Sequence, residues 1–196
     1  MTETPTRTPQ SERTRLMRQR LMESTVDSLV ELGWAGTTTT VVSRRAGVSR
    51  GAQLHHFPSK QDLVVAAVEY LAERRRADLD VTVGDLSTRA ALDLLASQYT
   101  SPVFLAALEL WVAARTDADL LARVAPMERR FGREIHARAL DLLQVDEARG
   151  RNRPLVQATL DLLRGLGLAA TLSDDSARRS AILDAWADTL DRELER

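Results

Sequence analysis

The feature that most constrains this chain is the stretch of residues 37–60, which reads TTTTVVSRRAGVSRGAQLHHFPSK. The hydroxyl residues at 37–40 can cap a helix, because their side-chain oxygens accept hydrogen bonds from the free amides of a first turn. Gly47 then ends that helix, since glycine adopts the left-handed conformation of a C-cap at little steric cost. Ser49 can cap a second helix that ends before Pro58. A helix, a glycine-containing turn and a helix form the helix-turn-helix pattern.

The polar residues of this stretch have the chemistry of a DNA-contact surface. Arginine and glutamine on a short helix can bind base edges in the major groove, which is wide enough to admit a helix. Hydroxyls, cations and the amides of a helix N-terminus suit phosphate oxygens. The predicted base contacts are Arg50, Gln53 and His55, and the predicted backbone contacts are Thr39, Thr40, His56 and Lys60, with Arg44 and Arg45 as outer candidates.

The segment AGVSRGAQLHHFPSKQDL resembles the recognition region of the TetR family of one-component transcriptional regulators, which usually runs close to AGVSxGxxYxHFxxKxxL. The matching positions are Ala46, Gly47, Val48, Ser49, Gly51, His56, Phe57, Lys60 and Leu63. The resemblance extends back through residues 21–34. Leu54 departs from the pattern, because the family usually has a tyrosine there whose hydroxyl reaches a phosphate. Gln53 stands where an apolar residue is common, so it either reads bases or packs under the helix.

Composition favours an all-α fold. Apolar residues make up 44% of the 196 residues, whereas 9 glycines and 6 prolines are few, and no window alternates as a strand would. The absence of cysteine excludes disulfides and thiolate chemistry and fits a cytoplasmic protein. We expect no membrane span, because no run of about 18 apolar residues occurs, and the N-terminus lacks the apolar centre of a signal peptide.

Charge and helix pattern together predict the domain organisation. Residues 1–60 carry a net charge of +4 and the remainder −5, within a total of −1; a basic head on an acidic body is typical of a nucleic-acid reader joined to a separate body. We predict a flexible tail at 1–12, a helix-turn-helix DNA-binding domain with its connecting helix at 13–80, and a helical ligand-binding and dimerisation domain at 81–196.

The apolar pattern of the body, residues 81–196, predicts five helices, at roughly 86–99, 102–115, 118–145, 152–171 and 176–195. Pro126 predicts a kink or a split near Ala125. The last two helices carry apolar stripes with small residues that permit close approach. These stripes either complete the core of one chain or join two chains in a four-helix bundle, which is the dimer that the resemblance implies. The predicted interface residues are Leu160, Leu163, Gly167, Ile182, Trp186 and Leu190.

Most aromatic residues of the body fall in its middle. Bulky rings on neighbouring helices beside a proline either pack as a core or enclose an apolar ligand pocket with few polar groups. The predicted lining is Phe104, Leu108, Trp111, Met127 and Phe131, with Glu109 or His136 as the polar handle. Such a lining suits a lipophilic small molecule.

Enzyme motifs are missing from the sequence: there is no GxSxG, no phosphate-binding glycine loop and no HExxH. His55 and His56 point about 100° apart on a helix and do not make a metal pair, and no cofactor is expected. The sequence predicts a non-enzymatic homodimer that binds an inverted repeat in double-stranded DNA. The resemblance implies a repressor released by a small lipophilic effector. The alternative is a DNA-binding regulator whose body binds a partner protein.

Overall fold

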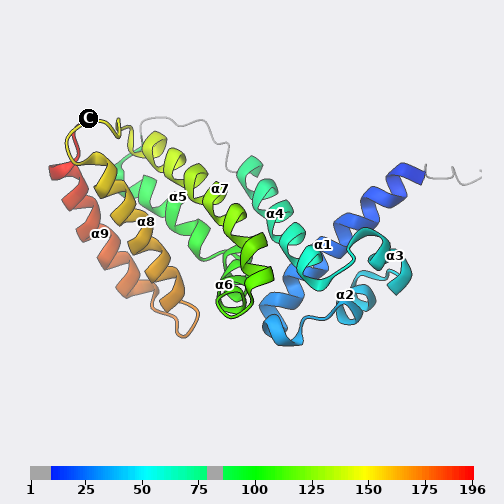
Figure 1. The fold of residues 1–196 in the computed structure, drawn as a ribbon. Coiled ribbons are helices and arrows are strands. Elements are labelled where there is room, and N and C mark those ends of the chain that lie inside the picture. The colour runs from blue at the N-terminus through cyan, green and yellow to red at the C-terminus, as the bar shows by residue number, and fades with distance from the viewer. Residues whose placement is uncertain (1–9, 79–85) are drawn as a thin grey trace, which may run out of the picture. The chain divides into compact units, whose positions relative to one another are not determined.

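The computed structural model describes residues 10–78 and 86–196, which form nine α-helices and no strand (Figure 1). The all-α prediction is therefore confirmed over these residues. None of these helices is long and apolar enough to cross a membrane. The helices are α1 (Gln10–Gly36), α2 (Thr39–Ala46), α3 (Arg50–His56), α4 (Lys60–Asp78), α5 (Thr88–Tyr99), α6 (Pro102–Ala114), α7 (Ala118–Leu143), α8 (Asn152–Ala169) and α9 (Ser176–Glu193).

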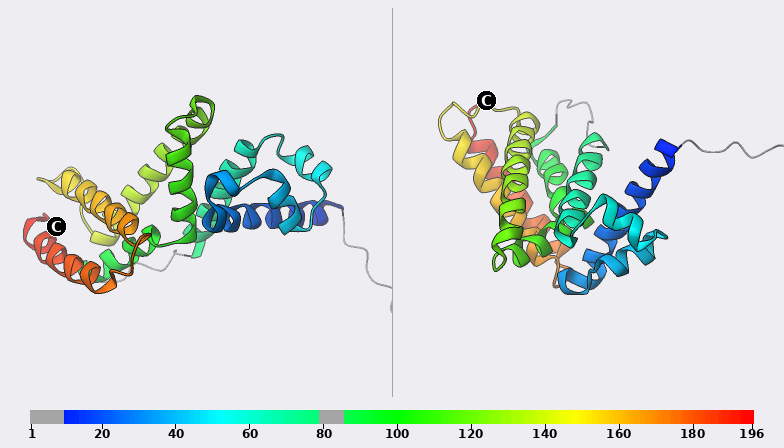
Figure 2. Two further views of the ribbon diagram at one scale, coloured as in Figure 1. Left: turned by 90° about the horizontal axis from the view of Figure 1, so that it is seen from below. Right: turned by 45° about the vertical axis from the view of Figure 1, so that its right-hand side comes forward.

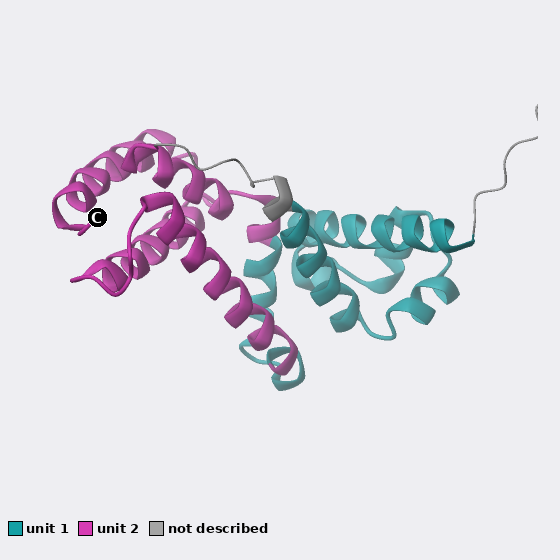
Figure 3. Cartoon of the chain, turned by 90° about the horizontal axis from the view of Figure 1, so that it is seen from above, with its two compact units in different colours: residues 1–78, 106–121 teal, residues 79–105, 122–196 magenta. Residues whose placement is uncertain are grey.

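The chain divides into two compact units (Figure 3). Unit 1 comprises Met1–Asp78 and Ala106–Leu121, and unit 2 comprises Leu79–Leu105 and Ala122–Arg196. The end of the first segment lies close to the border predicted near residue 80. The predicted body at 81–196 differs from this division, because most of α6 and the start of α7 pack with the N-terminal helices.

Unit 1 is built on the pairing of α1 with α4, while α2 packs on α1 and α3 follows α2. Apolar residues spaced three or four positions apart along α1 and α4 meet in its core, where Leu21, Leu29, Leu63 and Val64 are almost completely buried. Burying each large aliphatic side chain contributes about 1.5–3 kcal/mol. These contacts hold the short helices α2 and α3, which are too short to be stable alone.

The first helix begins inside the segment predicted as a flexible tail, and it is interrupted near its other end. It begins at Gln10, so residues 10–12, predicted as part of the tail, are helical. Gly33 breaks its regular path with φ 66° and ψ −178°, and a further turn runs on to Gly36. The rest of the predicted tail, residues 1–9, lies outside the described residues.

Unit 2 contains a layer in which α5 packs against both α8 and α9 (Figure 2). The approach of α8 to α5 needs glycine at position 167, because a Cβ there would lie 2.3 Å from the carbonyl oxygen of Tyr99.

In α7 the predicted split does not occur, since the helix continues through Pro126. At the far end, the buried Asn152 amide donates to the carbonyls of Asp146 and Glu195 at 2.9 and 2.8 Å, tying the C-terminus to the loop before α8.

The residues predicted to form the dimer interface lie largely inside one chain. Leu160, Leu163 and Leu190 are buried, with 2%, 1% and 0% of their surface exposed, and Gly167 abuts Tyr99. Ile182 and Trp186 are half-buried, and the Trp186 indole donates to Thr159 Oγ1 at 2.9 Å. The prediction is corrected for the buried residues: the apolar stripes of α8 and α9 complete the core of unit 2.

Candidate DNA-binding interface

The ends of α2 are fixed by the residues that the sequence singled out. Thr38 is the N-cap, and its hydroxyl accepts from the amide of Val41 at 3.2 Å. Gly47 has the left-handed conformation, with φ 64° and ψ 35°. Its amide donates to the Arg44 carbonyl and that of Val48 to the Ser43 carbonyl, at 3.3 and 2.9 Å. This Schellman pattern ends α2 and turns the chain into α3.

The helix α3 is capped at its start by Ser49, whose hydroxyl accepts from the amide of Ala52 at 3.2 Å. It ends at Phe57, whose amide donates to the Gln53 carbonyl at 2.8 Å. The next helix begins with Ser59 and Asp62 bonded to each other: the serine hydroxyl accepts from the Asp62 amide at 3.0 Å and donates to its carboxylate at 2.7 Å. The helix-turn-helix is therefore set by short-range capping.

The outer surface of this motif carries exposed cations. Arg44, Arg50 and His55 are exposed, as is the apolar Leu54 that replaces the family's tyrosine. Neither arginine pairs with a carboxylate among the described residues of the chain. Thr40 is exposed and Thr39 half-buried at the start of α2. The surface can therefore offer donors to phosphates and base edges without breaking an internal ion pair.

The structure corrects the prediction that Gln53 reads bases. Its side chain is fully buried, with 0% of its surface exposed. The amide nitrogen donates to the carbonyl of Phe57 at 2.7 Å, and the amide oxygen has no hydrogen-bond partner within the described part of the chain. Gln53 therefore packs beneath α3, as the apolar residue common at this position would.

Two predicted phosphate contacts have partners inside the unit. The Lys60 ammonium donates to the carbonyl of Trp34 at 2.5 Å and lies 3.8 Å from the centre of its indole. Burial lowers the pKa of Lys60. Arg45 forms an ion pair of 2.5 Å with Glu31 of α1. These cations hold α4 and α2 to α1, so binding a phosphate would compete with those contacts.

The two adjacent histidines differ in environment. His55 is exposed, His56 is half-buried, and their rings meet edge to face with centres 5.2 Å apart. Partial burial lowers the pKa of His56, and the neighbouring His55 and Arg18 lower it further. Arg18 comes from α1, and its guanidinium carbon lies 5.5 Å from the centre of the Phe57 ring. Sequence reasoning missed Arg18, although its spacing of four from Met22 continues the buried stripe of α1.

The residues predicted to line a ligand pocket are distributed over both units. Phe104 and Met127 are buried, and the others are half-buried. The two candidate polar handles have other partners: Glu109 accepts from the backbone amide of Trp34 at 2.6 Å, and His136 lies 3.0 Å from the carboxylate of Glu147. The described residues contain no cluster of acidic and histidine side chains that could hold a metal ion.

The chain is similar in sequence to known regulators. Residues 21–67 match the family described as bacterial regulatory proteins, tetR family. The HTH-type transcriptional regulator CymR of Pseudomonas putida is 38% identical over 121 residues, covering 59% of this chain and 60% of CymR. The regulator Rv2912c of Mycobacterium tuberculosis is 30% identical over 128 residues, covering 62% of this chain and 66% of that protein. The matches thus span less than two thirds of either relative. Both relatives are named as regulators and not as enzymes.

Solved structures share the fold over nearly the whole chain. A transcriptional regulator from Rhodococcus sp. Rha1 has a TM-score of 0.75 and 22% identity, covering 91% of this chain and 98% of its own. The multidrug binding protein EbrR, complexed with malachite green, has a TM-score of 0.62 and 22% identity, with the same coverage. At these identities the structures establish the fold alone. The family match over residues 21–67 and the motif that follows Ala46 identify the helix-turn-helix part of this chain as that of the TetR family of bacterial regulatory proteins.

Proposed function

We propose that this chain is a ligand-responsive transcriptional regulator that binds a palindromic operator as a homodimer in the cytoplasm. The observation that carries the DNA-binding half is that Arg44 on α2 and Arg50 on α3 are exposed and have no carboxylate partner in residues 10–78 and 86–196, and that His55 on α3 is exposed as well. Capped short helices present these side chains on one motif, which is the arrangement that base and phosphate contacts require. A dimer with two-fold symmetry matches an inverted repeat, with half-sites about one helical turn apart, roughly 34–36 Å.

Selection of bound fragments from random duplex DNA, followed by footprinting, tests this half. We expect an inverted repeat protected on both half-sites. Arg50→Ala should reduce discrimination between the selected site and unrelated DNA by about 1–3 kcal/mol, because a base contact is lost. Protection of a single half-site by a monomer would contradict the proposal.

The dimer surface that we propose differs from the buried stripe. Leu168 near the end of α8 and Leu172 in the loop that follows have 50% and 90% of their surfaces exposed. The exposed face of α9 carries small residues at regular spacing, Ala177, Ala181 and Ala185. Exposed aliphatic side chains, and small residues along an exposed helix face, suit the close packing of helices from two chains. This surface leaves the core of unit 2 intact.

The effector that we propose is a small lipophilic molecule that releases the DNA. The aromatic residues that the sequence gathers between positions 104 and 131 motivate this proposal, and the shared fold of EbrR, which was solved with malachite green, supports it. Such a ligand acts by binding one of two conformations more tightly, and its effect on the free energy of DNA binding cannot exceed the difference in its own binding free energy between the two conformations.

The second candidate function is binding of a partner protein by the body, and exposed aliphatic side chains such as Val112 favour it. Native mass spectrometry of the purified protein separates the two, since a retained small mass supports the effector.

A further inference from the structure

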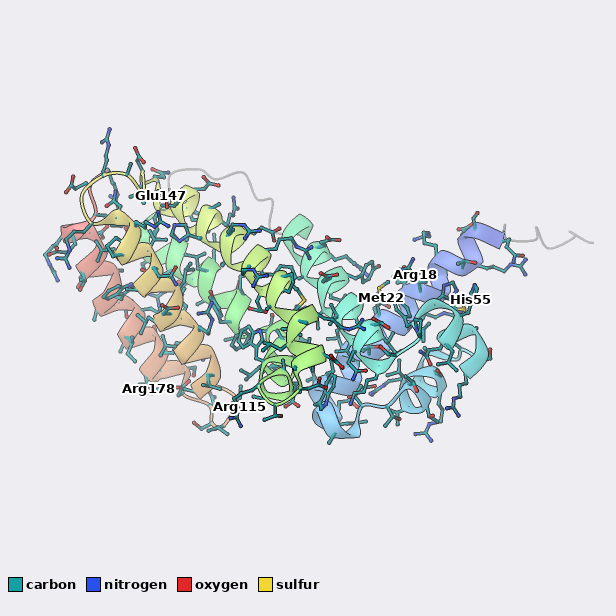
Figure 4. The ribbon with its side chains drawn as sticks, viewed as in Figure 1. Arg18, Met22, His55, Arg115, Glu147 and Arg178 are labelled. Carbon is teal, nitrogen blue, oxygen red and sulfur yellow. The ribbon has the colours of Figure 1, made fainter. Side chains whose placement is uncertain are left out.

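Arg18 is placed by the fold at the C-terminal end of α3. Its guanidinium carbon lies 5.5 Å from the centre of the Phe57 ring, and Phe57 is the residue that ends α3. Phe57 is itself buried, whereas Arg18 is exposed. A planar guanidinium stacked on an aromatic face keeps its edge free for hydrogen bonds. Figure 4 labels Arg18 on the N-terminal half of α1 and His55 on α3.

The face of α1 that carries Arg18 is the one that packs into the unit. Met22, Thr25 and Leu29 follow Arg18 at spacings of four, seven and eleven, so all four side chains lie on one side of the helix. Met22, Thr25 and Leu29 are buried. Arg18 continues this face beyond the core, where α1 passes the end of α3. Arg20, two positions away, points about 200° around the helix, toward the opposite side.

The ion pairs of unit 1 separate its arginines into two groups. Arg45 pairs with Glu31 at 2.5 Å and Arg74 with Glu23 at 2.7 Å. Arg18 has no carboxylate partner among the described residues, like Arg44 and Arg50 on the helix-turn-helix. The electrostatic effect of Arg18 reaches α3, since it is among the causes that lower the pKa of His56. An unpaired cation next to a DNA-reading helix is free to bind an anion.

The length of α3 is close to the width of the major groove. Its seven residues span about 10 Å at 1.5 Å per residue, and the major groove is about 12 Å wide. A helix of this length that crosses the groove has one end near each phosphate strand. In that orientation the C-terminal end of α3, where Arg18 lies against Phe57, would face one of the two phosphate strands.

We infer that Arg18 is a further DNA-binding residue, a phosphate contact supplied by α1 and positioned by Phe57 at the C-terminal end of α3. The inference rests on the proposed DNA-binding function. The contact is to the backbone, so it adds affinity without sequence preference. Arginine suits this role because its planar group can stack on Phe57 and still present two N–H donors to a phosphate.

The test compares Arg18→Ala with the matched control Arg20→Ala, on the full chain. The probes are two duplexes of about 30 base pairs, the selected operator and one of unrelated sequence, titrated over a series of salt concentrations. We expect Arg18→Ala to weaken binding to both duplexes by a similar factor and to reduce the salt slope by about one unit. Arg20→Ala should leave affinity and slope unchanged. Arg18→Lys should restore most of the slope but less of the affinity, because it keeps the charge and loses the planar stacking.

An unchanged salt slope in Arg18→Ala, or an equal loss in Arg20→Ala, would overturn the inference. Thermal melting of each variant separates a lost contact from a lost fold. If Arg18→Ala is unfolded, Arg18→Gln keeps more of the side chain and has the same expected slope. Arg50→Ala in the same assay separates the two proposals: a loss of operator selectivity there, with Arg18→Ala unchanged, rejects only the role of Arg18. If the wild-type protein binds neither duplex, the proposed function itself fails.

Discussion

The carboxylate of Glu109 in α6 accepts a hydrogen bond of 2.6 Å from the backbone amide of Trp34, the residue after the break in α1 at Gly33. The carbonyl of the same Trp34 accepts from Lys60 at the start of α4. One residue is thus held by side chains from two other helices. The Glu109 bond joins the second segment of unit 1, Ala106–Leu121, to the first.

We expect Glu109→Ala to lower the free energy of unfolding by about 1–3 kcal/mol, because it leaves the Trp34 amide without its acceptor. Glu109→Gln should recover much of this loss, since its amide oxygen can accept the same bond. Urea unfolding measures the change, and hydrogen exchange at the Trp34 amide should accelerate in the alanine variant alone. Equal exchange rates in the two variants would show that the bond does not protect this amide.

Gln53→Leu should raise stability and leave sequence preference intact. The substitution removes a buried amide oxygen that has no partner, which costs about 1–3 kcal/mol to bury, while it gives up the bond to the Phe57 carbonyl. We expect a net gain of about 1 kcal/mol or less, measured by thermal or urea unfolding. A changed preference at one base position of the selected operator would show that Gln53 does read DNA.

Stability should fall as the pH decreases below about 6.5, through His56. The folded-state pKa of His56 lies below its ordinary value of 6.5, so the unfolded chain binds the proton first. The contribution is lost between 6.5 and the lower folded value, and His56→Gln should remove that part of the slope. DNA affinity should change in the opposite direction, because phosphates favour the protonated ring. An identical pH dependence of unfolding in His56→Gln and the wild type would contradict this assignment.

Leu168→Arg should shift the protein from dimer to monomer. The new charge would be buried between two chains if Leu168 lies in the proposed interface, and burying an unpaired charge is costly. Ala137→Arg, at an exposed position of α7, is the matched control and should remain dimeric. Analytical ultracentrifugation over a range of concentrations measures both. A dimer as stable as the wild type in Leu168→Arg would place the interface elsewhere.

The fluorescence of Trp111 should report effector binding, and Trp111→Phe is the variant that removes this signal. A lipophilic ligand beside Trp111 should change its fluorescence, and the difference between wild type and Trp111→Phe separates this signal from those of Trp34 and Trp186. We expect Trp111→Ala to reduce the ligand response while operator binding stays close to normal. A broad panel of lipophilic compounds that alters neither fluorescence, melting temperature nor operator release would reject the effector proposal.

The helix ends of the DNA-binding motif were predictable because they depend on neighbours within a few residues. Thr38, Gly47 and Ser49 act through bonds to positions three or four residues away, and the sequence displays such pairs directly. An apolar stripe is less informative. It marks the face of a helix that is buried, and the stripes of α8 and α9 fitted a single-chain core as well as a dimer.

Contacts between distant segments were not predictable from spacing. Glu109 was singled out as a carboxylate among apolar residues, but its partner is a backbone amide 75 positions away, and a backbone amide has no sequence signature. Gln53 is a similar case. Its type favours a DNA contact, whereas its burial follows from the packing of α3 on the rest of the unit.

The bond between Glu109 and Trp34 bears on the engineering of hybrid regulators. A fragment of residues 1–80 contains the complete recognition motif but lacks the carboxylate that the Trp34 amide requires. If this fragment were grafted onto the body of another regulator, the recipient would have to present an acceptor at the same place on its own sixth helix. Compatibility between donor and recipient can therefore be screened at one position before any hybrid is made.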